Sequence, residues 1–464
     1  MNGRAALFAS CALSLLTLTG CPLTDDYRID ADYGAGGTNQ GGKAAGGQNS
    51  ALKGGAGATT LASGGSGGDS STCSASTCNG ACCSGECVDL RTDAANCGKC
   101  GMACSSGRAC STGVCTPGWL SCAAPPTAFV ARQRAAYASF SGKLFVFGGV
   151  DAAGTELNTG AIDDPALDSW QSTAVDTNTP SARDLATAIW TGSSIMVFGG
   201  RNQKGSVVLA DAALYDPVTN RWTKATAGST ARAAATVGVY SGMAIFWSGL
   251  DASMIPIAGA DRYRVSTDSW WTSTASNGPL KLGHTACAGI DAYFYAYGGI
   301  DTTLSKTDKA YRYSFVTNTW STIARGPAAR WDAYGATDGT NFFVWGGRDE
   351  TAAKADGSAY ETQWVAMGAT GAPSARSAPL RESGWTFALD GKGFALLGGF
   401  GTSGTMLHDG GVYSTASDAW VSIPAWPSGE DHHYGAAVAA GSELVVFGGG
   451  DGTRVTNTCE RYSL

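Results

Sequence analysis

The chain has 464 residues, of which 15% are charged, and its formal net charge is −7 at pH 7. This length exceeds that of a typical single domain, so several parts are expected. The chain has no basic stripe and no run of lysine and arginine, so we predict no nucleic-acid partner. Its low charge and abundant small residues favour a protein outside the cytoplasm.

Residues 1–20 have the features of an export signal. Arg4 supplies a short positive region, residues 5–18 are apolar, and Leu18-Thr19-Gly20-Cys21 follows. This sequence resembles a bacterial lipobox, in which cleavage before the cysteine leaves Cys21 as a lipidated N-terminus. An ordinary secretory peptide with a chance cysteine is the alternative.

The predicted lipid on Cys21 is the only membrane contact that we expect. The apolar stretch is too short for a retained spanning helix, and no later segment reaches about eighteen apolar residues. Pro22 follows the cysteine in place of aspartate, so nothing argues for retention in an inner membrane. We therefore predict an anchor in the bacterial outer membrane, on its surface or its periplasmic face.

Residues 21–72 are predicted to form a flexible tether behind the lipidated cysteine. Glycine, alanine, serine and threonine dominate this segment, and large apolar side chains are almost absent after Tyr33. Such a segment cannot bury enough surface to fold. With about fifty residues its root-mean-square span is roughly 40 Å, enough to lift a domain off a membrane.

Residues 73–115 contain ten cysteines. An even number in a short exported segment predicts a disulfide framework of up to five bridges, whose connectivity the sequence does not reveal. The run Asn96-Cys97-Gly98-Lys99-Cys100-Gly101 resembles a small cysteine-rich module of surface proteins in predatory soil deltaproteobacteria. A zinc site at Cys97 and Cys100 is the alternative, but an oxidising compartment favours disulfides and no metal is expected.

From residue 116 onward an apolar run ends seven times in a glycine doublet or a near equivalent, at intervals of 48 to 52 residues. A period in this range indicates a propeller or an array. Each run has four or five residues and reads as a buried strand, and the doublet allows positive φ. The doublets are Gly148-Gly149, Gly199-Gly200, Ser248-Gly249, Gly298-Gly299, Gly346-Gly347, Gly398-Gly399 and Gly448-Gly449.

A tyrosine followed seven residues later by tryptophan repeats in phase with the doublets. Blade one keeps Trp170 but has Asp163 in place of tyrosine, and blade five shortens the spacing. The pairs are Tyr215 with Trp222, Tyr263 with Trp270, Tyr313 with Trp320, Tyr413 with Trp420 and, shortened, Tyr360 with Trp364.

The doublets and the aromatic pairs together resemble the kelch family of β-propellers. Kelch blades are four-stranded, with a double glycine after the second strand, tyrosine on the third and tryptophan on the outermost fourth. The resemblance covers roughly residues 119–464 and implies an all-β, seven-bladed propeller over residues 116–464.

The seventh repeat stops at Tyr462, before its fourth strand. Trp119 stands upstream of the first doublet without a tyrosine of its own, so we predict that it supplies the missing strand and closes the ring. Pairing of Tyr462 with Trp119 would place Cys459 opposite Cys122, within disulfide reach. Two free thiols are the alternative. Cys287 then remains as a lone buried cysteine.

The sequence shows no recognisable catalytic constellation. It contains no Gly-x-Ser-x-Gly elbow, no His-Glu-x-x-His helix and no phosphate loop. The four histidines and Cys287 do not match the ligand set of a copper oxidase on a kelch scaffold, as in the galactose oxidase family. We therefore expect no catalytic residue and no cofactor, and leave open whether the chain is an enzyme.

A basic residue stands sixteen positions before most doublets, where the innermost strand begins. These side chains are predicted to ring one mouth of the propeller and to contact a partner. The alternative is that each arginine ties a loop carbonyl or a neighbouring acid. The candidates are Arg132, Arg183, Arg232, Arg330 and His432, with Arg376 or Arg381 in blade six.

Trp331, Trp385 and Trp426 stand in loop or strand-entry segments near charged residues such as Arg381. Aromatic faces beside arginines and acids predict a platform for a sugar or an extended peptide. Packing between blades is the alternative. Glu382 and Asp431 offer a pair of acids for glycosidic chemistry, at a separation that the sequence does not define.

We expect a monomeric, lipid-anchored binding protein whose propeller rim recognises a protein or a glycan outside the cytoplasm. A carbohydrate-active enzyme on a kelch scaffold is the first alternative. A structural component of the envelope is the second.

Overall fold

A computed structural model of the chain describes residues 73, 80–104, 108–228, 230–253, 255–273, 285–301, 305–349, 351, 353–368, 384–389, 392–401, 406–441, 443–451 and 454–464. The predicted signal peptide, Cys21 and the tether lie outside these residues. Two compact units are separated between Thr116 and Pro117. Within the described part, no helix has the length and apolar character needed to span a membrane.

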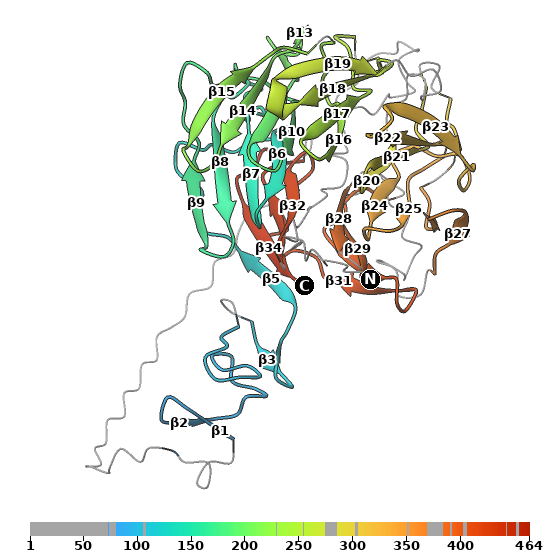
Figure 1. Cartoon of the computed structure of the whole chain (residues 1–464). Helices are drawn as coiled ribbons and strands as arrows, with labels where there is room; N and C mark the ends of the chain where they lie inside the picture. The colour runs from blue at the N-terminus through green and yellow to red at the C-terminus, as the bar shows by residue number, and fades with distance from the viewer. Residues whose placement is uncertain are drawn as a thin grey trace, which may run out of the picture. The chain divides into compact units, whose positions relative to one another are not determined.

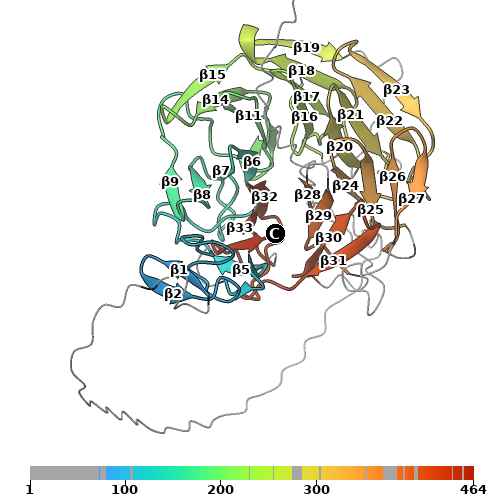
Figure 2. The same ribbon diagram turned by 60° about the horizontal axis from the view of Figure 1, so that its bottom comes forward.

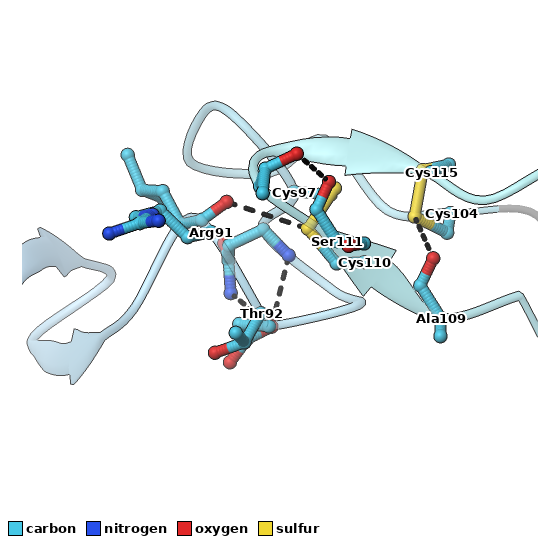
Figure 3. Close-up of a disulfide and its surroundings, with 12 residues drawn as sticks. Arg91, Thr92, Cys97, Cys104, Ala109, Cys110, Ser111 and Cys115 are labelled. Atoms are coloured by element: carbon cyan, nitrogen blue, oxygen red, sulfur yellow. Dashed lines mark hydrogen bonds between the residues drawn. A yellow bond between two sulfur atoms is a disulfide. The ribbon is translucent and has the colours of Figure 1, made fainter.

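The cysteine-rich unit consists of short hairpins stapled by disulfides. Strands β1 (Ala81–Cys83) and β2 (Glu86–Val88) form one hairpin, and β3 (Cys110–Ser111) and β4 (Val114–Cys115) form another. The bonds whose two cysteines are both described are Cys73–Cys82, Cys83–Cys100, Cys97–Cys110 and Cys104–Cys115. Figure 3 shows the last two of these.

These bonds confirm a disulfide framework, and Cys87 is disulfide-bonded as well. Cys97 and Cys100 belong to two different disulfides, so the alternative zinc site at this pair is wrong. The described apolar core of this unit consists only of buried cysteines, Cys83, Cys97 and Cys110. Disulfide bonds therefore replace a hydrophobic core in this unit. Each disulfide contributes about 3 kcal/mol to the free energy of unfolding if it acts by restricting the unfolded chain.

The described residues between 117 and 464 form seven four-stranded antiparallel sheets arranged in a ring (Figure 1). Blade one is β6 (Ala136–Phe140), β7 (Lys143–Phe147), β8 (Gly160–Asp164) and β9 (Ser169–Ser172). Blade two is β10 (Thr187–Trp190), β11 (Ile195–Phe198), β14 (Ala212–Asp216) and β15 (Arg221–Ala225), with an added hairpin of β12 (Arg201–Asn202) and β13 (Val207–Val208). Blade three is β16 (Thr236–Tyr240), β17 (Met243–Trp247), β18 (Ala260–Arg264) and β19 (Ser269–Ser273).

Blades four to seven repeat this order. Blade four is β20 (Ala286–Ile290), β21 (Tyr293–Tyr297), β22 (Ala310–Ser314) and β23 (Thr319–Ile323). Blade five is β24 (Tyr334–Thr337), β25 (Phe342–Trp345), β26 (Gly357–Tyr360) and β27 (Trp364–Ala366). Blade six is β28 (Trp385–Leu389), β29 (Gly393–Leu397), β30 (Gly410–Ser414) and β31 (Ala419–Ile423), and blade seven is β32 (Ala436–Ala440), β33 (Glu443–Phe447), β34 (Cys459–Ser463) and β5 (Gly118–Ser121).

The ring closes through both ends of the propeller segment. Strand β5 lies in the same blade as β33 (Figure 2) and pairs with β34, with Trp119 opposite Tyr462 in the register. Cys122 and Cys459 form a disulfide across this pair, with a Cα–Cα distance of 5.2 Å. Both predictions are confirmed. The prediction of a lone thiol at Cys287 is wrong, because this buried residue of β20 is disulfide-bonded.

The doublets let neighbouring backbones approach closely. Gly149 has φ of 89°, and a Cβ atom there would stand 2.5 Å from the carbonyl oxygen of Gln133. A side chain at this position would therefore push apart the second strand and the entry to the first.

The repeat tyrosines link one blade to the previous one. The hydroxyl of Tyr215 donates to Asn220 Oδ1 at 2.8 Å, and the same oxygen accepts the backbone N–H of Ala174 from blade one at 2.6 Å. Tyr263, Tyr313 and Tyr413 each donate in the same way to the side chain five residues later. The tyrosine therefore orients a side chain that bridges two blades.

Candidate binding surface of the propeller

The predicted arginine ring is buried, with exposures of 1% or 2% for Arg132, Arg183, Arg232 and Arg330. Each Nη1 donates to the carbonyl oxygen of the first residue of the doublet in its own blade, as Arg183 does to Gly199 at 2.9 Å. These arginines cannot contact a partner, so the prediction that they form a binding rim is wrong. The alternative interpretation, in which each ties a loop carbonyl or an acid, describes them.

Three of these arginines also form ion pairs within their blades. Arg183 pairs with Asp211 at 2.7 Å, Arg330 with Asp356 at 3.0 Å, and Arg232 with Asp261 at 3.0 Å. Arg132 has no such acid among the described residues and instead donates to the carbonyl and hydroxyl oxygens of Thr159. Its guanidinium carbon lies 3.6 Å from the centroid of the Phe129 ring, and burial lowers its pKa to about 9.

His432 fills the arginine position in blade seven and is fully buried. Its Nδ1 lies 2.6 Å from the carbonyl oxygen of Gly448, and its Nε2 lies 3.3 Å from Glu460 Oε2. Burial raises the pKa of Glu460, but hydrogen bonds from His432 and Ser428 bring it below its usual value. His432 therefore has the structural role of the arginines, and the prediction that it binds a partner is wrong.

The three candidate tryptophans do not form one platform. Trp426 is 3% exposed, donates from Nε1 to the carbonyl oxygen of Glu430, and packs on His408 and Trp119. It is therefore a packing residue, as the alternative proposed. Trp385 is half-buried and lines a small recess with Trp426 and His433.

Trp331 is half-buried in the entry to blade five, where the guanidinium carbon of Arg348 lies 5.7 Å from its ring centroid. The recess at Trp385 does not include it. Arg376, Arg381 and Glu382 lie outside the described residues. Asp431, the second candidate acid, is occupied by His408, whose Nε2 lies 2.5 Å from Asp431 Oδ1.

An exposed group of basic and aromatic side chains lies on blade three, away from the predicted positions. Arg264 has its guanidinium carbon 5.6 Å from the ring centroid of Trp271, which is 44% exposed. Nη2 of Arg264 lies 3.4 Å from the sulfur of Met243, and Nη2 of Arg262 lies 3.2 Å from the same sulfur. The sulfur therefore holds two guanidinium groups side by side.

The group continues into blade four through backbone contacts. Arg262 donates to the carbonyl oxygen of Phe315 at 3.0 Å, and the N–H of Phe315 donates to the carbonyl oxygen of Ala292 at 2.9 Å. Next to Ala292 is Tyr293, which is 37% exposed and carries Arg312 with its guanidinium carbon 4.6 Å from the ring centroid. We name Met243, Arg262, Arg264, Trp271, Tyr293 and Arg312 the basic–aromatic cluster.

No ion pair of these arginines is seen among the described residues. No described carboxylate lies within 4.0 Å of Arg262, Arg264 or Arg312, and Arg312 also forms a hydrogen bond with the Tyr295 side chain. Burial raises the pKa of Tyr313, over which Arg262 also lies, to about 12, so this phenol is neutral. The cluster thus presents uncompensated positive charge on a chain of net negative charge.

The sequence analysis did not predict this cluster, because its members do not occupy the repeat position sixteen residues before each glycine doublet. One signal was available, since arginine immediately precedes the repeat tyrosine in blades three, four and seven, as Arg262, Arg312 and Arg461. In blade seven the guanidinium of Arg461 pairs with Asp168 at 2.8 Å. Only the folded structure separates this paired arginine from the two unpaired ones.

Comparisons with known proteins agree with this architecture. The model of the KLHDC2/KLHL20/DRC7 Kelch-repeats domain matches residues 114–279, and that of the Stigma-specific STIG1-like protein family matches residues 66–117. Kelch-like protein 25 of Xenopus tropicalis is 28% identical over 263 residues, which cover 53% of this chain and 42% of that protein. The chain therefore spans less than half the length of this curated relative.

Among solved structures, one titled "Structure of YjhT" is similar over 64% of this chain and 98% of its own, with 16% identity and a TM-score of 0.49. The propeller segment is thus similar to kelch-repeat proteins.

Proposed function

We propose that this chain is an extracytoplasmic, lipid-anchored binding protein whose propeller recognises an acidic protein segment through the basic–aromatic cluster. The absence of any carboxylate within 4.0 Å of Arg262, Arg264 and Arg312 among the described residues carries this proposal. Three buried arginines of the same propeller, Arg183, Arg232 and Arg330, are ion-paired. An anionic partner would supply the negative charges that the cluster arginines lack.

The chemistry of the cluster favours an extended acidic chain. Guanidinium groups bind carboxylates through paired, charge-assisted hydrogen bonds. The exposed rings of Trp271 and Tyr293 offer apolar contact area beside these donors. Because the contacts run from blade three into blade four, several residues of one extended segment can bind along them. A glycan bearing carboxylates or sulfates is the other partner class that the sequence allows.

A binding experiment tests this proposal with the full chain purified under oxidising conditions. The probes are a fluorescent polyglutamate peptide and a fluorescent uronic-acid oligosaccharide. Replacing both Arg264 and Arg312 with glutamine should weaken peptide binding by roughly tenfold or more, because two charge-assisted hydrogen bonds are lost. Arg221→Gln, in an exposed arginine of β15 outside the cluster, is the matched control and should change the Kd by less than about twofold.

The outcomes separate the partner classes. Equal weakening by the control would show that net charge alone attracts the peptide, and the proposed surface would then be abandoned. Binding of the oligosaccharide in place of the peptide, with the same sensitivity to the double variant, would keep the surface and replace the acidic protein by an anionic glycan.

The lipid anchor needs its own experiment. We propose that Cys21 carries the lipid, since Leu18-Thr19-Gly20 precedes it and a short apolar segment precedes that. Growth of an expressing bacterium with an alkyne fatty acid should label the chain, and Cys21→Ser should abolish the label. Label that persists in this variant would exclude Cys21 as the anchor, and fractionation of the labelled chain would identify the membrane.

A further inference from the structure

Asp163 is a buried carboxylate without a hydrogen-bond partner. It lies in β8 at the position of the repeat tyrosine, it is 0% exposed, and neither of its side-chain oxygens is hydrogen-bonded in the described structure. The residue five positions later, Asp168, accepts from the backbone N–H of Ala123 and from Arg461 instead. Burying a carboxylate without hydrogen-bond donors reduces the stability of the fold. A chemical role for Asp163 would account for its presence here.

The group beside this carboxylate is the disulfide that closes the ring. A carboxylate oxygen of Asp163 and the sulfur atoms of Cys122 and Cys459 all lie within 4.8 Å of one another. A disulfide has no hydrogen to donate to a carboxylate, whereas a thiol has one. Asp163 therefore gains a donor only when this disulfide is reduced.

The two sulfur-bearing residues differ in their access to solvent. Cys459 is buried at 6% exposure, whereas Cys122 is half-buried. An external thiolate can therefore reach Cys122, and attack there leaves the electron pair on the sulfur of Cys459, in the interior beside Asp163. That leaving group needs a proton as the bond breaks, and Asp163 is the acid that lies beside it.

The other charged groups around Asp163 are ion-paired. Arg461 of β34 lies 2.8 Å from Asp168 and 3.6 Å from Glu443 of β33, and Asp164, next to Asp163 in β8, lies 2.7 Å from Nζ of Lys143. Burial raises the pKa of Asp163 to about 7, with Arg461 opposing the rise and the three acids adding to it. Near neutral pH this carboxyl is thus present both with and without its proton.

We infer that the Cys122–Cys459 disulfide is a thiol–disulfide exchange site for an external dithiol, with Asp163 as the acid that protonates the leaving Cys459 sulfur. A thiolate of the dithiol attacks Cys122, the bond between the two cysteines breaks, and its electron pair remains on Cys459. The proton of the Asp163 carboxyl moves to this sulfur. The new thiol can then donate a hydrogen bond to the carboxylate.

The second step completes a two-electron exchange. The second sulfur of the dithiol, as a thiolate, then attacks the first sulfur of the dithiol in the mixed disulfide. The Cys122 sulfur leaves and takes a proton from solvent. The dithiol is thereby oxidised to a disulfide and the chain is reduced to two thiols, while solvent restores the proton of Asp163. After this exchange no covalent bond joins β5 to β34.

The test follows reduction of the full chain by dithiothreitol, with timed alkylation and mass spectrometry of the peptides that contain Cys122 and Cys459. At pH 6.5 the native chain should lose this disulfide at least about tenfold faster than Asp163→Asn, as expected for loss of a positioned proton donor. Asp164→Asn, which removes the neighbouring carboxylate of β8, is the matched control and should leave the rate within about twofold of native. The disulfides of the cysteine-rich unit report any change in the reductant itself.

The pH profile separates proton donation from a merely structural role. Between pH 5 and pH 9 the logarithm of the native rate should rise with the thiolate fraction of the reductant and then flatten near pH 7, where Asp163 loses its proton. In Asp163→Asn this break should be absent. Equal rates in both chains, or an unbroken rise in the native chain, would overturn the inference. The second outcome needs no variant, so it applies even if Asp163→Asn fails to fold.

Discussion

Nε1 of Trp222 donates a hydrogen bond to the carbonyl oxygen of Ala174 at 3.0 Å, across the boundary between blades two and one. Trp170, Trp270 and Trp364 make the same bond to Ala123, Thr226 and Ala324. The outermost strand of each of these blades is thus tied to the chain that enters it. This explains why tryptophan, with one donor on a large apolar ring, is repeated there.

The hydrogen bond from Nε1 of Trp222 and the buried apolar surface of its ring should contribute separately to stability. Trp222→Phe keeps most of the buried area and loses the donor, so it should lower the free energy of unfolding by about 1 kcal/mol. Trp222→Ala also leaves a cavity and should cost about 3–5 kcal/mol. Urea unfolding measures both values. Trp271→Ala, in the exposed tryptophan of β19, is the control and should cost clearly less than Trp222→Ala.

The ion pair between Arg232 and Asp261 should matter for folding and not for binding. Both side chains are almost fully buried, at 1% and 0% exposure. Asp261→Asn leaves the guanidinium charge without its partner and should destabilise the chain by about 3–5 kcal/mol. Affinity for the polyglutamate probe, measured on the folded fraction, should stay unchanged. If Asp261→Asn instead lowered the affinity without lowering the stability, the buried arginines would have to belong to the binding site.

The ring-closing disulfide should stabilise the propeller strongly. Cys122 and Cys459 are 337 residues apart in sequence, and a loop of this size contributes up to about 5 kcal/mol in the chain-entropy treatment. Replacing both cysteines with serine should lower the midpoint of chemical unfolding accordingly. Limited proteolysis should then cut first around β5. An unchanged midpoint would show that strand pairing alone holds the ring closed.

Asp163 should make the stability of the propeller depend on pH. Its folded pKa of about 7 exceeds the ordinary aspartate value of 3.8, so between these values the folded chain holds a proton that the unfolded chain releases. Stability from this group is present at low pH and is lost as pH rises toward 7. Between pH 5 and pH 8 the free energy of unfolding of the native chain should fall by about 3 kcal/mol, whereas that of Asp163→Asn should not show this fall. Urea unfolding at both pH values checks the difference, and parallel losses in the two chains would contradict it.

The sequence predicted the fold well because its signals are local and repeated. The doublet at Gly148-Gly149 and its counterparts mark the same backbone geometry in each blade, and the Tyr462–Trp119 register followed from counting. The arginine and histidine candidates at the repeat position failed for a related reason. Arg132 and its counterparts recur because the fold needs them, so regular spacing indicated structure and not recognition. The packing of the folded blades leaves Arg264 and Arg312 without an acidic partner among the described residues, which no local pattern encodes.

The shared construction of blade seven has a consequence for how the chain acquires its fold during synthesis. Strand β5 leaves the ribosome early, but its partner β34 is synthesised only after all the strands of blades one to six. Blades one to six can pair their own strands as they emerge, whereas β5 must remain unpaired until β34 has emerged. Closure is therefore a late event of high contact order. Until then the exposed edges of the incomplete ring are the part of the nascent chain most open to aggregation.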